Sequence, residues 1–256
     1  MVELSQLNTV GLFTGPHRSG STLFAAIIDS HPNARCANET GRSGVYIKLG
    51  EGAINGSDFL ERIVKESNTP NLGDRVVVRP AGEVLVRQYR YEIEKIPKRG
   101  ILSICDASGP WFGRGTIKNP KVALEAKKQF GGKLRVLTIV RNPWDNFATM
   151  KLLGQSIGLF EAWCRGTAAV STTIDSCHEI FHLEDLIFQP EQTIQKLCDF
   201  LSIPFIEEHI KAWEKKIWKK PHKRATSVEW KQDEIDVINR LIDDLPWMAR
   251  YRNLDG

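Results

Sequence analysis

This chain lacks any Cys-x-x-Cys pair, and its five cysteines lie far apart. Several of them stand in apolar segments, so we expect buried free thiols in a protein of a reducing compartment. The N-terminus lacks the apolar core of a signal peptide, and no apolar run is long enough to span a bilayer. These absences predict a cytoplasmic protein without membrane contact, unless the sequence was trimmed from an anchored parent.

A large excess of one charge is also lacking, since 35 basic and 31 acidic residues leave a net charge of +4. No dense run of lysine and arginine could follow a nucleic-acid backbone, so we expect no nucleic-acid partner, and an anionic cosubstrate fits better. The nearest basic patch, within residues 215–224, is interpreted as a solvated helix end. The chain shows no internal repeat and no linker. It therefore predicts one domain over residues 1–256.

Apolar segments with strand and helix periodicity alternate along the chain. The predicted strands cover residues 9–14, 76–78, 101–106, 134–140 and 179–183, and the predicted helices cover residues 58–66, 121–130, 160–167, 194–201 and 235–245. This alternation indicates the α/β class with a parallel sheet.

A polar loop at residues 15–22 joins the first strand directly to a helix. Gly15 and Gly20 allow the backbone to curl around an anion, toward which the free N–H groups and the helix dipole point. Three hydroxyl groups add donors, those of Ser19, Ser21 and Thr22. The stretch therefore predicts a phosphate-binding loop.

The spacing from Gly15 to Gly20 matches a nucleoside-triphosphate loop, but Ser21 stands where that loop carries its lysine. The cation is instead Arg18, two residues before Gly20. Two alternatives stay open at this point: an ordinary strand–turn–helix, and a degenerate kinase loop. For a kinase, Asp106 at the end of an apolar strand would be the magnesium-binding aspartate, although a turn-capping role explains it equally well.

A second candidate anion site follows the strand at residues 134–140. Arg141 stands at its carboxyl end, where open α/β sheets bind ligands, and Thr149 follows eight positions later across a turn into a helix. Near the C-terminus, Lys223, Arg224 and Ala225 precede Trp230. From its place at the strand end, Arg141 predicts a contact with a ligand, and a guanidinium can recognise an anionic group with a bidentate fork. An Arg141–Asp145 ion pair is the structural alternative.

Together these segments resemble the sulfotransferases that use 3′-phosphoadenosine-5′-phosphosulfate (PAPS). The loop from Pro16 to Thr22 is similar to the family's 5′-phosphosulfate loop, and Arg141 with Thr149 is similar to its 3′-phosphate motif. Lys223, Arg224 and Trp230 match the segment that closes over the 3′-phosphate, with Ala225 in place of glycine. Residues 182–204 resemble a family scaffold segment, with His182 where tyrosine is common.

The resemblance implies a three-layer, nucleotide-kinase-like domain with a central parallel sheet of about five strands flanked by helices. It implies transfer of a sulfuryl group from PAPS to a hydroxyl or amine of a small-molecule acceptor, with the desulfonated nucleotide PAP as product and no metal. Peptidyl tyrosine is the alternative acceptor, and a nucleotide-binding module without catalysis is the non-enzyme alternative. The oligomeric state stays open, a homodimer included.

Five residues are candidates for a catalytic role. Glu39, within a stretch that resembles the tyrosylprotein sulfotransferases, is predicted to be the general base, while pairing with a nearby arginine is its structural alternative. His17, in the loop, and His31, at the end of the following helix, are the other candidate bases. Arg18, together with Lys118 of a Lys-x-Pro element, is predicted to supply the cations that stabilise the transferring group.

Overall fold

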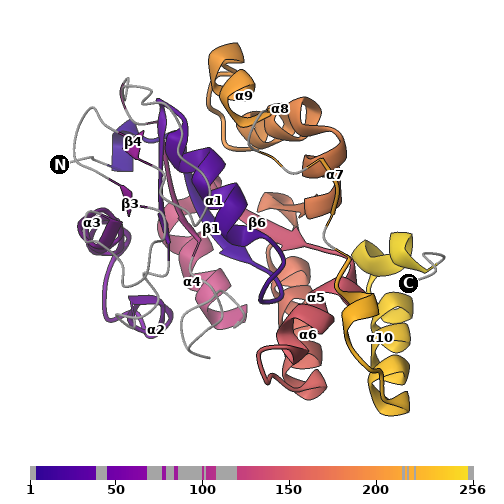
Figure 1. The fold of residues 1–256 in the computed structure, drawn as a ribbon. Coiled ribbons are helices and arrows are strands. Elements are labelled where there is room, and N and C mark those ends of the chain that lie inside the picture. Colours follow the sequence, from indigo (N-terminus) through magenta and orange to yellow (C-terminus); the bar gives the residue numbers. More distant parts are fainter. Residues whose placement is uncertain are drawn as a thin grey trace.

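A computed structural model describes residues 4–38, 45–67, 77–78, 84–85, 100, 102–107, 120–214, 217, 219–221 and 223–252 of the chain. Its main feature is one five-stranded parallel sheet with the strand order β2-β5-β1-β6-β7 (Figure 1). The strands are β1 (Thr9–Thr14), β2 (Ala34–Asn38), β5 (Ser103–Ala107), β6 (Leu134–Val140) and β7 (His178–His182). The predicted α/β class and parallel sheet are confirmed.

Helices flank this sheet. The α-helices are α1 (Ser21–Ser30), α2 (Val45–Gly50), α3 (Gly56–Ser67), α4 (Pro120–Phe130), α5 (Pro143–Lys151), α6 (Ile157–Thr173), α7 (Leu183–Phe188), α8 (Pro190–Phe200), α9 (Glu207–Glu214) and α10 (Gln232–Asp244). Short 3-10 helices include η6 (Ala225–Ser227) and η7 (Pro246–Tyr251). Figure 1 shows α8 and α9 packed together, while α10 lies beside α6.

Alternating side chains of the central strands divide the core into two faces. Val10 and Leu12 of β1 pack with α2, α3 and α4, whereas Phe13 packs with α1, α7, α8 and α9. Leu134 and Val136 of β6 follow the first pattern. This split reflects the two-residue period of a strand, and it gives the sheet a layer of helices on each side. A third cluster joins α5, α6, α10 and η7 at the end of β6.

Two sequence predictions need correction here. The stretch Ala34–Asn38 forms an edge strand that its mixed polar sequence did not reveal. Residues 76–78, predicted as a short strand, contribute β3 (Val77–Val78), which pairs antiparallel with β4 (Val84–Leu85) in a separate two-stranded sheet. The cysteine prediction is confirmed, because all five are free and buried. None of the described helices is long and apolar enough to cross a membrane.

The topology selects one edge of the sheet for binding. After β1 the chain crosses to β2 on one side, and it later adds β6 and β7 on the other side. In open α/β sheets, ligands bind beyond the carboxyl ends of the strands at such a reversal. Gly15 follows β1 and Arg141 follows β6, so both sequence-predicted anion sites begin at this edge.

Candidate active site

The loop at residues 15–22 is held in a shape that glycine makes possible. Gly15 has φ +132°, and a Cβ there would collide with the carbonyl oxygen of Ile139 on the neighbouring strand. Gly20 has φ +102°, and a Cβ there would lie 2.9 Å from a methyl carbon of Leu183. Arg18 also has a positive φ, +67°. The predicted tight loop is therefore present and packs against the end of β6.

The donors of this loop precede the first turn of α1. The first backbone bonds inside the helix go from Leu23 and Phe24 to the Gly20 carbonyl, so the N–H groups of Ser21 and Thr22 lie before the helical ladder begins. The Ser19 side chain is 1% exposed, and its hydroxyl has no hydrogen-bond partner among the described residues. A buried donor beside a helix N-terminus suits an oxyanion.

His17 is buried within the fold. Its ring lies edge-on to Trp163 at 5.4 Å between centroids, and its Nδ1 lies 3.2 Å from Oε1 of Gln155. His31, another candidate base, lies at the opposite end of α1, about 15 Å of helix away. There its ring contacts the Pro204 carbonyl and accepts from the Asn33 N–H, which indicates a structural role.

Arg141 and Thr149 meet as their spacing predicts. An Nη1 hydrogen of Arg141 is donated to the Thr149 hydroxyl oxygen at 3.3 Å, and that hydroxyl donates to the Asp145 carbonyl at 2.9 Å. Burial lowers the pKa of the Arg141 guanidinium, an effect that the nearby carboxylates of Asp145 and Glu184 oppose. A cation held half-buried at a strand end is well placed to bind an anion.

Residues 223–231, here called the strap, lie across α5 beside Arg141. One carboxylate oxygen of Asp145 accepts the backbone N–H groups of Arg224 and Ala225, the second at 2.9 Å. Trp230 donates its indole N–H to the Ala225 carbonyl at 2.9 Å. The strap also brings the Arg224 charge close enough to Arg141 to lower the pKa of that guanidinium. Arg224 of the C-terminal segment and Arg141 are thus brought together.

Alanine at position 225 is compatible with this conformation. Arg224 has φ −97° and Ala225 opens the 3-10 helix η6, so this turn does not need the backbone freedom of glycine.

A family model described as "Sulfotransferase family" matches residues 12–207 of the chain. The chain belongs to the sulfotransferase family. A sequence search of curated proteins returns no significant match. The reaction class is therefore sulfuryl transfer, and the protein is a sulfotransferase rather than a P-loop kinase.

Solved structures with the same fold include the sulfotransferase domain from the curacin biosynthetic pathway, at 12% identity and a TM-score of 0.53 over 93% of this chain and 97% of that chain. They also include a sulfotransferase from Alicyclobacillus acidocaldarius, at 13% identity and a TM-score of 0.51 over 97% of this chain and 96% of that chain. At these identities the likeness shows a shared fold.

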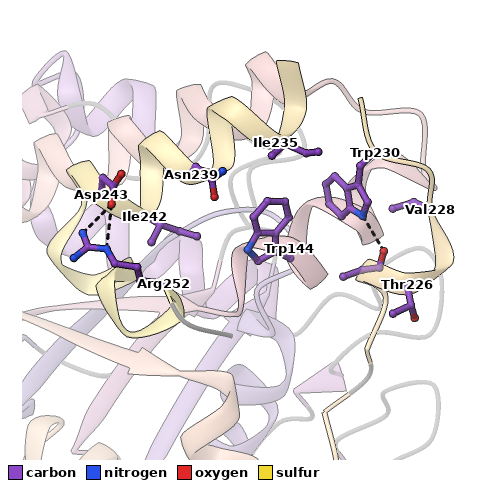
Figure 2. Close-up of a pocket in the computed structure, with 10 residues that line it drawn as sticks. Trp144, Thr226, Val228, Trp230, Ile235, Asn239, Ile242, Asp243 and Arg252 are labelled. Atoms are coloured by element: carbon purple, nitrogen blue, oxygen red, sulfur yellow. Dashed lines mark hydrogen bonds and ion pairs between the residues drawn. The ribbon is translucent and has the colours of Figure 1, made fainter. Parts of the chain in front are cut away.

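In this sulfotransferase a cavity of about 770 Å³ lies between the strap and helix α10. Figure 2 shows Trp144 in its centre, with Trp230, Val228 and Thr226 on one side and the ion pair of Arg252 with Asp243 on the other. The two indole rings meet edge-on at 5.2 Å between centroids. The cavity is lined by Trp144, Ala225, Thr226, Val228, Trp230, Ile235, Asn239, Ile242, Asp243 and Arg252. Trp230 therefore stabilises the strap, of which it is part, through its bond to the Ala225 carbonyl and its packing on Trp144.

A hydrogen-bonded chain holds the turn that carries Arg141. Glu184 accepts the backbone N–H of Asn142 at 2.8 Å and the Tyr251 hydroxyl at 2.7 Å. Because that hydroxyl hydrogen is used, Nδ1 of His182 donates to the Tyr251 oxygen at 2.9 Å. Burial, aided by the charge of Arg250, lowers the pKa of His182 to about 4, so the ring is neutral. The segment at 182–184 is scaffold, as its resemblance implied.

Two predicted catalytic residues, Glu39 and Lys118, lie outside the described residues. Glu39 directly follows β2, which ends at the same edge of the sheet as β1. Lys118 comes two residues before α4. In the described part of the chain, no three His, Cys, Asp or Glu side chains gather as ligands for a metal ion.

Four contributors to the site were missed from the sequence. Asn142 caps α5 with its side-chain oxygen, Asp145 anchors the strap, Asn146 contacts the loop, and Tyr251 supports Glu184. The Asn-Pro at the helix start was a local signal for the cap. The partners of the other three lie far away in the sequence, so no spacing could have revealed them.

Proposed function

We propose that this sulfotransferase transfers the sulfuryl group of PAPS to a hydroxyl or amine of a small-molecule acceptor and releases PAP. The observation that carries the proposal is the pair of anion-binding features at one sheet edge. The loop after β1 touches the end of β6, where Arg141 begins the second feature. A nucleotide with phosphates at both its 5′ and 3′ positions matches two such features, whereas AMP would use one. We propose that residues 1–256 act as one domain.

The residues present fit this nucleotide. The N–H groups at the start of α1 and the hydroxyls of Ser19, Ser21 and Thr22 would hold the 5′-phosphate, with Pro16 and Gly20 shaping the loop. Arg141, Thr149, Lys223 and Arg224 would hold the 3′-phosphate, with Trp230 supporting the strap. Lys223 and Arg224 have exposed side chains, so they can close onto a ligand from the solvent side.

In the transfer, the acceptor oxygen or nitrogen forms a bond to sulfur while the bond from sulfur to the phosphate oxygen breaks. Arg18 and Lys118 would neutralise the charge that develops on the leaving oxygen, in the role that metal ions play in kinases. Glu39 would accept the acceptor's proton. Since β5 separates β2 from β1, the end of β2 lies about 10 Å from the loop, which leaves space for an acceptor between them.

Nucleotide binding tests the donor assignment. Arg141→Ala should weaken PAP by about 2–3 kcal/mol, roughly 30- to 150-fold, because a charge-assisted bidentate contact is lost. AMP, which lacks the 3′-phosphate, should bind nearly as before. Calorimetry with PAP, AMP and ATP, with and without magnesium, measures both. Arg240→Ala, on the exposed face of α10, is the matched control. Equal losses for PAP and AMP would refute the 3′-phosphate assignment.

Turnover tests the catalytic assignment. Glu39→Gln should lower kcat by about 10²–10⁴ while PAP affinity stays near that of the native enzyme. Full activity is expected in excess chelator. A panel of phenols, amines and a tyrosine peptide as acceptors separates small-molecule from peptide sulfation. If Glu39→Gln keeps native turnover while His17→Ala abolishes it, the base is His17 instead.

A further inference from the structure

Asn146 on α5 makes a direct bond between the two anion-binding features. Its side chain is 1% exposed, and its Nδ2 donates to the backbone carbonyl of His17 at 3.0 Å. The preceding residue, Asp145, accepts two backbone N–H groups of the strap. Successive residues of a helix point about 100° apart, so one turn of α5 contacts the loop with one side chain and the strap with the next.

The bond to His17 sets the orientation of one peptide group. The described chain has no cis peptide bond, so the carbonyl of His17 and the N–H of Arg18 point in opposite directions. With the carbonyl directed at α5, the Arg18 N–H is directed away from it. Arg18 then adopts φ +67°, a conformation that non-glycine residues keep only where their surroundings enforce it. Left-handed residues of this kind turn successive N–H groups into an anion-binding concavity.

Packing alone does not account for an asparagine at this position. Its Oδ1 is buried and has no hydrogen-bond partner among the described residues. An apolar side chain of similar size would fill the space without leaving an acceptor unsatisfied. The reason for the amide is therefore its donor, which reaches the loop.

We propose that Asn146 is a positioning residue that fixes the spacing between the 5′-phosphate loop and the 3′-phosphate site, and so selects nucleotides that carry both phosphates. The inference rests on the proposed function. Helix α5 carries Thr149, whose hydroxyl oxygen accepts a hydrogen bond from Arg141. The helix that forms part of the proposed 3′-phosphate site therefore also contacts the loop through Asn146. A nucleotide bound at both ends gains affinity from this fixed spacing, in the same way that a short rigid linker raises effective concentration.

The test compares three nucleotides in Asn146→Ala: PAP, adenosine 5′-monophosphate and adenosine 3′-monophosphate. PAP should lose at least about 10-fold in affinity, whereas each monophosphate should lose less than about 3-fold, because each site survives and only their spacing loosens. In turnover assays, the KM for the donor should rise more than kcat falls. Gln155→Ala is the matched control: it removes a contact to the same His17 from outside α5 and should leave the difference between PAP and the monophosphates intact.

The outcomes separate the two proposals. A native enzyme that binds PAP no better than the monophosphates overturns the proposed function and this inference with it. A native preference that survives in Asn146→Ala overturns the inference alone. So does an equal loss for PAP and the 5′-monophosphate, which would limit Asn146 to shaping the loop. If Asn146→Ala does not fold, Asn146→Leu keeps the branching at Cγ, removes the donor and carries the same expectations.

Discussion

We propose that the loop at residues 15–22 and the strap at residues 223–231 hold anions in opposite ways. The loop is one continuous stretch whose donors are mostly backbone N–H groups, and its shape depends on glycine and on the strand beside it. The strap acts through side chains, and it is held in place by a carboxylate 79 residues away in the sequence. Backbone changes should therefore disrupt the first, and single side-chain changes the second.

The largest effect is expected from Gly15→Ala. A Cβ there would meet the Ile139 carbonyl oxygen at a φ that disfavours any side chain, so the strand or the loop must shift. We expect a loss of about 3 kcal/mol in unfolding free energy and no measurable donor binding. Urea denaturation and calorimetry measure both.

Gly154→Ala is the control for that variant. Gly154 also has a positive φ, +74°, but nothing lies within 4 Å of a Cβ there, so it should lose only about 1 kcal/mol from backbone strain. If the two variants lose equal stability, the contact with β6 does not shape the loop.

Asp145→Ala tests the strap. Removing a carboxylate that accepts two N–H groups frees residues 224 and 225, so the KM for PAPS should rise about 10- to 100-fold, while kcat changes less. Asp145→Asn keeps one acceptor oxygen and should lose only part of this. Steady-state kinetics at varied donor concentration decides it, and an unchanged KM in Asp145→Ala would show that the strap position does not matter for binding.

Acid should lower the stability of the protein through His182, which supports the turn that carries Arg141. The folded pKa of about 4 lies below the ordinary 6.5, so between these values the unfolded chain binds more protons. Unfolding free energy should therefore fall by about 2 kcal/mol as the pH drops from 6.5 to 4, after a discount for partial exposure. Urea titrations over this range measure the slope.

His182→Phe supplies the comparison, because it should reduce the slope in that window. His178, whose pKa is also lowered by burial, should account for part of what remains. The carboxylates of Asp185 and Glu234, whose pKa values are lowered, lose their stabilising charge only at still lower pH. A variant that keeps the full slope would assign the acid sensitivity to other groups.

The smallest effect is expected from Lys151→Met. Lys151 bridges the strap and α10, donating to Glu234 at 2.6 Å and to the Glu229 carbonyl. Since this pair is partly exposed, we expect a loss of about 0.5–1 kcal/mol in stability and a rise in donor KM of less than about 3-fold. A rise as large as that of Asp145→Ala would mean that Lys151, rather than Asp145, anchors the strap.

The local features of the site could be predicted because their determinants are close in sequence. The strand–loop–helix unit follows from an apolar strand, two glycines and helical periodicity. The contact of Arg141 with Thr149 follows from eight residues across a strand end and two helical turns. The edge strand Ala34–Asn38 was missed because edge strands need no continuous apolar pattern. The burial of His17 could not be predicted from the sequence because Gln155 and Trp163, which contact its ring, belong to later segments.

By itself the sequence determined the α/β class, the tight loop between β1 and α1 and the identity of the cation after the fourth strand of the main sheet, because periodicity, glycine placement and short spacings act within one or two elements. Only the tertiary structure decided that Asp145 holds the strap, that Asn146 holds the loop and that Tyr251 supports Glu184. Each of these bonds joins segments more than 60 residues apart, and their geometry depends on how β1, β6 and α5 pack. The physical reason is that hydrogen bonds between distant segments leave no periodic trace in the chain.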